Sequence, residues 1–339
     1  MLNKAKEFVK RDLVLLIAII LAAVSSIFHK PDLNYVDVDV LLVLFSLMLV
    51  VALLKSIFFL DWLASKLLCH CTTFREVTNV LACLTFVVSM FVTNDVALIT
   101  FVPLALIIGR TIQLDMIRPV ILMTMAANLG SMLTPQGNPQ NLFLFNHFHY
   151  TPQGFLSIMS IPVLFSAVYI LLLIWRTKNV KVNFQLENMH ELNKKMTILA
   201  LFLLALNIAA VLHYLEKLPV IGVTLLAIIF VNWRLLMKAD YGLLLTFVGF
   251  FLFIGNIQQT DLVVYLKNSF LGTAWGTYMV ALGVSQFISN VPAAMLLAGL
   301  TDQANALLIG VNVGGLGTLI ASMASVISYK FFVGEHPYQ

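Results

Sequence analysis

Charged residues are scarce in this 339-residue chain, where Asp, Glu, Lys and Arg together make up only 11% of the sequence. Soluble domains carry about 25% charged residues, so the chain has less than half the charge of an ordinary water-exposed protein. Its residues are 60% hydrophobic and its mean hydropathy is +0.96. This shortage excludes a soluble enzyme, a nucleic-acid-binding module and a disordered linker, and it places the chain in a lipid bilayer.

Cysteine and clusters of reactive side chains are also scarce. Cys69, Cys71 and Cys83 are too few for a disulfide framework. No cluster of His, Glu and Asp and no nucleophile–base pair stands out, so we expect neither an enzyme nor a prosthetic cofactor. The net charge of +4 does not indicate a nucleic-acid partner, because the basic residues lie between apolar runs, where they set membrane orientation.

Long apolar runs predict an all-α polytopic membrane protein. Full spans are expected near 13–28, 37–59, 116–148, 152–175, 197–213, 218–236, 241–257 and 303–332. Two further stretches, 79–109 and 271–301, are each 31 residues long and have polar, helix-breaking residues in the middle. Two crossings need about 40 residues and one needs about 20. Each stretch therefore fits a re-entrant hairpin that returns to the side from which it entered.

The distribution of Lys and Arg supports this topology. With the N-terminus in the cytoplasm and the plasma (inner) membrane as the location, only Lys30, Lys217 and Lys267 of the 20 basic residues fall outside. This is the bias expected from the positive-inside rule. A single crossing at 79–109 would move Arg110 and Arg118 outside and reverse every later loop, so the hairpin fits better.

Two segments of the chain repeat a pattern. The first hairpin carries Thr93-Asn94-Asp95 at its middle, and the second carries Ser289-Asn290-Val291. An N-x-G-[SG]-x-x-T motif follows each, at 128–134 and at 312–318. Since the first hairpin opens to the cytoplasm and the second to the outside, these are inverted repeats. The expected organisation is an N-terminal helix (1–36), a first repeat (37–175), a cytoplasmic linker (176–196), connecting helices (197–236) and a second repeat (237–339) whose last helix is missing.

Broken elements at mid-membrane have a chemical meaning. Unwound backbone there is tolerated only where it lines a cavity or binds a ligand. Half-helix N-termini attract anions, while unwound carbonyls coordinate cations. The structural alternative is that Gly and Pro only kink packed helices. It accounts poorly for two hairpins and two broken helices that are arranged as an inverted pair.

These motifs resemble the citrate/arsenite permease branch of the ion transporter superfamily. The resemblance rests on 93–103, 128–141, 285–294 and 310–325, and it covers most of the chain from about residue 37 onward. It implies a homodimer with a fixed scaffold, an elevator-type transport domain, and transport of a small anion, such as citrate or a dicarboxylate, with sodium or protons. Better-known dicarboxylate relatives carry Ser-Asn-Thr at both tips, and both tips depart from that here.

Site residues follow from the motifs and the resemblance. We expect the substrate to contact Thr93, Asn94, Asn138, Asn141, Ser289, Asn290 and Thr318. We expect the coupling ion, sodium or a proton, near Asn94, Asp95, Asn128, Gly130, Thr134, Asn290, Asn312 and Gly314.

Asp95 leaves alternatives open. A carboxylate at mid-membrane is costly and is usually functional, but Asp95 also stands where it could cap the second half-helix of the hairpin. A sodium/proton antiporter in which Asp95 is the exchanging group, and an arsenite efflux permease, are the alternatives within transport. A channel is disfavoured because inverted hairpins are typical of alternating access.

Overall fold

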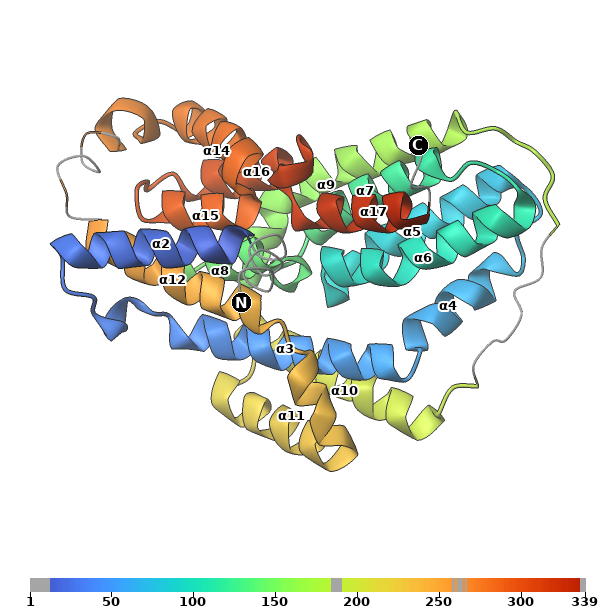
Figure 1. Cartoon of the computed structure of the whole chain (residues 1–339), viewed down its shortest axis with the longest axis horizontal. Coiled ribbons are helices and arrows are strands. Elements are labelled where there is room, and N and C mark those ends of the chain that lie inside the picture. Colours follow the sequence, from blue (N-terminus) through green and yellow to red (C-terminus); the bar gives the residue numbers. More distant parts are fainter. Residues whose placement is uncertain (1–12, 184–190, 258–259, 261–264, 266, 336–339) are drawn as a thin grey trace, which may run out of the picture.

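The computed structural model describes residues 13–183, 191–257, 260, 265 and 267–335 (Figure 1). Within these ranges the regular structure is helical, apart from a single antiparallel bridge between Thr73 and Lys181. The principal helices are α2 (Leu13–Phe28), α3 (Val38–Ser56), α4 (Phe59–Leu68), α5 (Phe74–Val92), α6 (Asn94–Ile112), α7 (Ile117–Ser131), α8 (Pro139–His147), α9 (Pro152–Trp175), α10 (Lys194–Val211), α11 (Lys217–Asn232), α12 (Tyr241–Ile257), α14 (Ala274–Ile288), α15 (Asn290–Ala298), α16 (Ala304–Gly314) and α17 (Met323–Glu335). The expected all-α polytopic fold class is confirmed.

Several helices are long and apolar enough to cross a bilayer. In the described part of the chain these are α3, α5, α6, α9, α10 and the segment Lys217–Lys238, which joins α11 to the short 3-10 helix Trp233–Lys238. At 1.5 Å per residue, a 19-residue helix such as α3 is about 28 Å long, close to the thickness of the hydrocarbon core. The carboxylate of Asp37 begins α3 by accepting a hydrogen bond from the backbone N–H of Val40 (3.0 Å).

The two expected hairpins differ in length. α5 and α6 meet at Thr93 and have 19 residues each, so the first hairpin is longer than the 31 residues expected from its apolar core. Its extra turns come from polar ends, where Thr73 and Glu76 form a capping box that begins α5. Because α5 and α6 are each long enough to cross a bilayer, length does not distinguish a re-entrant hairpin from two crossings here, and the re-entrant topology stays a prediction. α14 and α15 are shorter, with 15 and 9 residues.

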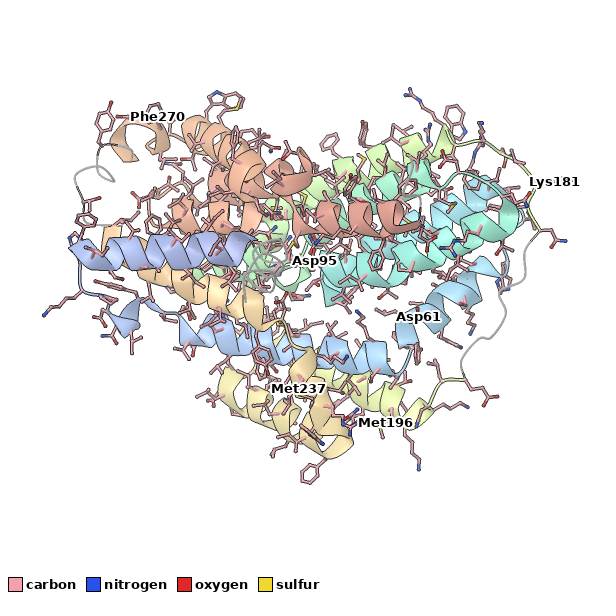
Figure 2. All side chains as sticks on the ribbon, in the orientation of Figure 1. Asp61, Asp95, Lys181, Met196, Met237 and Phe270 are labelled. Atoms are coloured by element: carbon pink, nitrogen blue, oxygen red, sulfur yellow. The ribbon has the colours of Figure 1, made fainter. Side chains whose placement is uncertain are left out.

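The hairpins lie toward opposite ends of the molecule. Figure 1 shows α5 and α6 toward one end of the long axis and α14 and α15 toward the other. In Figure 2, Asp95 lies near the middle of this axis, between Lys181 at one end and Phe270 at the other. The tip of the first hairpin therefore reaches the centre of the molecule.

Helix α7 and helix α16 end within one residue of the same position of the repeated motif. α7 ends at Ser131 and the chain continues through a 3-10 turn, Pro135–Gly137, into α8. α16 ends at Gly314 and continues through the 3-10 turn Leu319–Ala321 into α17. The residues around the first interruption are buried, whereas 317–320 in the second are exposed. These interruptions occupy the segments where the sequence predicts broken helices.

Helices α3, α10 and α11 form a separate packed group at one side of the molecule (Figure 1). A buried polar chain joins them: the Ser46 hydroxyl donates to Asn207 Oδ1 (2.6 Å), and Asn207 Nδ2 donates to the Thr224 hydroxyl (2.9 Å). Polar side chains buried in this way fix the register of membrane helices.

Parts of the chain differ from the sequence expectations or lie outside the description. α4 was not expected; it begins after Phe58, whose backbone is left-handed (φ 54°) and turns the chain away from α3. The expected linker begins by bonding to the start of α5, where the Phe74 N–H donates to the Val180 carbonyl (2.8 Å). Lys4, Lys6, Lys10 and Arg11, residues 184–190 of the linker, and the last four residues lie outside the described residues.

Candidate functional site

The two hairpin tips share an unusual backbone conformation. Thr93 has φ 88° and ψ 151°, and Ser289 has φ 74° and ψ 154°. Positive φ with extended ψ is a region that is essentially restricted to glycine, and holding another residue there costs about 1–3 kcal/mol. Such strain persists where the surrounding structure fixes it. At both tips it makes Asn94 and Asn290 the first residues of the next helix, with the unpaired N–H groups of α6 and α15 beside them.

Asn94 connects the first tip to the first interrupted helix. Its Nδ2 donates to Asn128 Oδ1 (3.1 Å), and its Oδ1 accepts from the backbone N–H of Asp95 (2.9 Å). Both asparagines are buried. The same Asn128 oxygen accepts a second hydrogen bond, from the hydroxyl of Ser322 (2.8 Å), which lies just before α17. One oxygen thus joins the first tip, the first interruption and the second interruption.

A reciprocal bond runs in the other direction. Asn138 Nδ2 donates to Asn312 Oδ1 (3.2 Å). Asn128 and Asn312 are the first residues of the repeated motif, and Asn138 and Ser322 each follow that residue by ten positions. Equivalent positions therefore make equivalent contacts across the two repeats. These reciprocal contacts are what the predicted inverted repeats would make, and the repeat organisation itself stays a prediction.

Asn141 braces the first interruption. Its Nδ2 lies 3.2–3.3 Å from the carbonyl oxygens of Ser131, Met132 and Thr134, at the end of α7 and in the segment that follows it. Its Oδ1 accepts from Asn312 Nδ2 (2.7 Å). Asn138 is similarly engaged, since its Oδ1 accepts from the backbone N–H of Asn141 (2.9 Å). In this structure both amides bond inside the protein, and their contact with substrate stays a prediction.

The motif threonines make the same hydrogen bond in both repeats. Thr134 Oγ1 donates to the Met90 carbonyl (2.5 Å) and Thr318 Oγ1 donates to the Gln286 carbonyl (2.9 Å). Met90 and Gln286 each lie three residues before a tip. Each bond therefore ties an interrupted helix to the end of the helix that leads into the tip.

Gln286 is a site residue that the sequence analysis did not identify. Its Nε2 donates to the Gly314 carbonyl (2.7 Å), and its Oε1 accepts from the backbone N–H of Thr318 (2.8 Å). A glutamine in an otherwise apolar helix, three residues before the tip, is a pattern that could have revealed it. Gln286 does for the second interruption what Asn141 does for the first, which is to pair backbone groups that the helix leaves unpaired.

The motif glycines pack the interrupted helices closely against the hairpins. A Cβ at Gly130 in α7 would collide with the Phe86 carbonyl in α5. A Cβ at Gly314 in α16 would lie 2.7 Å from Ser285 Cβ in α14. Such distances leave no room for a side chain, so these positions require glycine for close approach.

Asp95 has an acceptor that nothing in the described structure satisfies. Its Oδ1 is buried without a hydrogen-bond donor, and the same is true of Gln136 Oε1. No backbone N–H in the described part of the chain reaches Oδ1, as a capping role for this atom would require. Buried acceptors without donors are costly unless a proton or a cation satisfies them.

The second tip is connected differently from the first. Ser289 Oγ lies 3.4 Å from the Ala321 carbonyl and 3.5 Å from Asn290 Oδ1, both long for a hydrogen bond. Asn290 is buried, with Nδ2 against Gly315. In the described structure the Asn94–Asn128 bond has no counterpart between Asn290 and Asn312, so Asn290 is less tightly fixed than Asn94.

Comparison with known proteins gives three findings. Residues 1–328 match the family model described as a citrate transporter. An uncharacterized transporter of Methanocaldococcus jannaschii is 32% identical over 326 residues, which is 94% of this chain and 88% of that protein. The inner membrane protein YbiR of Escherichia coli is 28% identical over 299 residues, or 87% of this chain and 80% of that protein.

Proposed function

Because the chain belongs to the citrate transporter family, and is therefore a multi-pass membrane transporter of the citrate and anion permease type, we propose that it is a secondary active transporter of a small anion. The anion would be a carboxylate, such as citrate or a dicarboxylate, or an inorganic oxyanion. Coupling to sodium or protons would drive its movement by alternating access. The observation that carries this proposal is the reciprocal pair of contacts, Ser322 with Asn128 and Asn138 with Asn312, which joins two interrupted helices as inverted repeats.

The roles of the residues follow from their chemistry. The unpaired N–H groups at the starts of α6 and α15 attract a negative charge, and the tip amides Asn94 and Asn290 supply further donors. Thr93, Ser289, Thr318, Asn138 and Asn141 complete the set that we propose for the substrate. The first five residues proposed for the coupling ion lie in the first repeat, and the rest lie in the second: Asn94, Asp95, Asn128, Gly130 and Thr134, then Asn290, Asn312 and Gly314.

The setting is also part of the proposal. The relative in Escherichia coli is named an inner membrane protein, which supports the plasma (inner) membrane as the location. The distribution of Lys and Arg supports an N-terminus in the cytoplasm. We propose a homodimer in which α3, α10 and α11 remain fixed while the hairpins and interrupted helices move. The protein would need no cofactor besides its coupling ion, and it would be a carrier and not an enzyme.

Flux measurement in proteoliposomes tests the proposal. Purified protein should take up a radiolabelled anion, with citrate, succinate and arsenate as probes, only when a sodium or proton gradient is present. Uptake should stop when the gradient is collapsed with an ionophore. Cation/proton exchange with no anion uptake, or a leak that follows no gradient, would contradict anion transport.

A sodium/proton antiporter is the second candidate, and the unsatisfied Oδ1 of Asp95 favours it. Asp95→Asn separates the two, because it keeps the shape and hydrogen-bonding capacity of the side chain but removes its charge. An anion symporter with this change should lose its response to sodium and pH yet still exchange substrate for substrate. An antiporter would lose all activity, since its exchanging group is gone. The measurement is substrate counterflow, compared with gradient-driven uptake in the same vesicles.

A further inference from the structure

A cavity of about 380 Å³ lies between α7 and α17. Apolar side chains form most of its wall, and the described residues that line it include no charged side chain. The principal apolar contributors are Ile121, Met125, Leu316, Leu319 and Phe332. Ligand pockets for small molecules are typically about 300–1,000 Å³ and mostly apolar, with a few placed polar groups. This cavity has the size and the character of such a pocket.

One end of the cavity meets the candidate site. Asn128 and Ser325 line this end, and Asn128 is the residue that bonds both Asn94 and Ser322. Helix α17 begins here, at Met323, so the positive end of its dipole lies in this region. The N–H groups of Ser325 and Val326 already bond the Ser322 carbonyl, which leaves the Ser325 side chain to face a ligand. An amide, a hydroxyl and a helix N-terminus together form an anion-binding end.

The other end of the cavity is bordered by basic residues. Ile117 and Phe332 line it; Arg118 follows Ile117 directly and is exposed. Arg110 pairs with Glu335, the last residue of α17 (2.5 Å), and Arg118 Nη2 donates to the Leu173 carbonyl on α9 (2.9 Å). Both guanidinium groups are thus engaged within the protein, so the groups that would stabilise an anion lie at the inner end of the cavity.

Between these ends the wall offers little to a polar ligand. The Thr124 hydroxyl already donates to the Ser328 hydroxyl (2.7 Å), and apart from the phenolic hydroxyl of Tyr329 the other lining side chains there are aliphatic or aromatic. A carboxylate placed against such a wall loses its hydration without a replacement hydrogen bond. Citrate has three carboxylates and could seat only one of them at the inner end.

From this arrangement we infer that the cavity binds a monocarboxylate with an apolar body, such as an aryl- or branched-alkyl-substituted acid. The carboxylate lies at Asn128, Ser325 and the start of α17, and the apolar body lies along α7 and α17. The inference rests on the proposed function and narrows its substrate class, because the cavity opens from the same asparagine that connects the two repeats.

Binding of 3-phenylpropionate to the full-length protein in phosphatidylcholine nanodiscs tests this inference. We expect saturable binding of the radiolabelled acid. Acetate, which has the same carboxylate without the apolar body, should compete at least tenfold more weakly, and citrate should not compete. Equal competition by acetate or citrate would overturn the inference.

Variants locate the site. Ile121→Ser removes apolar wall and should weaken binding about five- to tenfold, as expected from about 0.8 kcal/mol per buried methylene. Its matched control is Ile161→Ser on α9, which is 63% exposed and lies outside the cavity, and it should bind like the original protein. Ser325→Ala should weaken 3-phenylpropionate but not the neutral 3-phenylpropanol. Met125→Trp should fill the cavity and abolish binding.

Two further outcomes are decisive. If native mass spectrometry finds a bound phospholipid that Ile121→Ser removes, while the acids do not bind, the cavity is a lipid site and the inference fails. If citrate is taken up by proteoliposomes and 3-phenylpropionate neither binds nor competes, the inference fails while the transport function stands. If the acid binds in the cavity but no anion is carried, the transport function fails while the site remains.

Discussion

The hydroxyl of Ser322 donates a hydrogen bond to Asn128 Oδ1 over 2.8 Å, although 194 residues separate the two in the sequence. Its counterpart joins Asn138 to Asn312 over 3.2 Å. Each interrupted helix is therefore held by a side chain from the other repeat. A substitution at one interruption should therefore change the energetic cost of a substitution at the other, and this coupling can be measured.

Removing both partners of this bond should cost less than the sum of the single changes. Ser322→Ala should lower the free energy of unfolding by about 1 kcal/mol, and Asn128→Ala by more, because the Asn128 oxygen also bonds Asn94. Since the double variant loses the shared bond only once, its cost should be less than additive. The measurement is denaturant unfolding in detergent. Ser157→Ala, which removes an exposed hydroxyl bonded within α9, is the control, and strict additivity would contradict the coupling.

Both tip asparagines should be needed for transport. Asn94→Ala and Asn290→Ala remove donors beside the helix N-termini of the two hairpins, and each should reduce flux at least a hundredfold with expression near normal. Asn94→Ala should also lower stability by about 1 kcal/mol, because it breaks the bond to Asn128. Flux and melting temperature check both points. Asn34→Ala, at an exposed position, is the control; unchanged flux in both tip variants would remove the tips from the site.

The motif glycines should not tolerate alanine. Gly130→Ala and Gly314→Ala place a Cβ against α5 and α14, and overpacking of this kind typically costs about 1–3 kcal/mol. Gly222→Ala in α11 meets no atom within 4 Å and should instead stabilise the helix by about 0.5–1 kcal/mol. Melting temperature should therefore shift in opposite directions. Equal shifts would mean that the helices are not packed as closely as described.

Cysteine labelling tests the topology. After replacement of the three native cysteines, Thr111→Cys and Gln113→Cys, near Arg110, should react only with thiol reagents that reach the cytoplasm. Asn305→Cys, after the second hairpin, should react with an impermeant reagent from outside. Both residues of the first pair are exposed in the structure, as is Asn305. External labelling at 111 or 113 would rule out the re-entrant topology of the first hairpin.

Acidification should lower the stability of the folded protein through His213, just beyond α10, because protonation would place a charged ring in a partly buried position beside Lys217. Burial, helped by Lys217 and His149, lowers the pKa of His213 below its usual 6.5. Its Nε2 lies 3.3 Å from Asn146 Oδ1, which also accepts from Lys217. The folded protein favours the neutral ring, so the contribution of His213 to the free energy of unfolding is fully present above pH 6.5. It should decline as the pH falls from 6.5 toward the lower pKa of the folded state.

Melting temperature between pH 5 and 8 checks the role of His213. The fall on the acid side should be smaller in His213→Gln, which keeps a hydrogen-bonding side chain without the titration. His29→Gln, at an exposed position, should follow the unaltered protein. Identical acid profiles for the unaltered protein and His213→Gln would show that this histidine does not contribute.

Much of the fold could be predicted from the sequence because membrane-spanning helices are long runs of apolar residues. The expected spans 13–28, 152–175 and 241–257 match α2, α9 and α12 residue for residue. The outer ends of α5 and α6 could not be found in this way, because their outer turns carry Glu76 and Arg110. A hydropathy profile does not detect helical turns that consist of polar residues. α4 escapes the sequence analysis because it has only ten residues and carries Asp61 and Lys66, so it is too short and too polar to be recognised as a membrane span.

The site was predictable at the level of motifs but not of contacts. The motif and the tips identified Asn94, Asn128, Asn138 and Asn312, which the structure links by hydrogen bonds. The use of Asn141 as a brace for three carbonyls depends on where α7 ends in space, and one-dimensional spacing does not contain this. Gln286 escaped notice for the same reason, since its partners lie 28 and 32 residues away.

The closeness of Gly130 to α5 and of Gly314 to α14 limits how the molecule can move. At these glycines no side chain separates the two helix backbones. A sliding movement of α7 along α5, or of α16 along α14, would therefore break the hydrogen bonds that Thr134 and Thr318 make nearby. Each hairpin and its interrupted helix should therefore move together as one rigid body. Under the alternating access proposed above, the movement that exposes the site first to one side of the membrane and then to the other would have to take place at the boundary with the remaining helices.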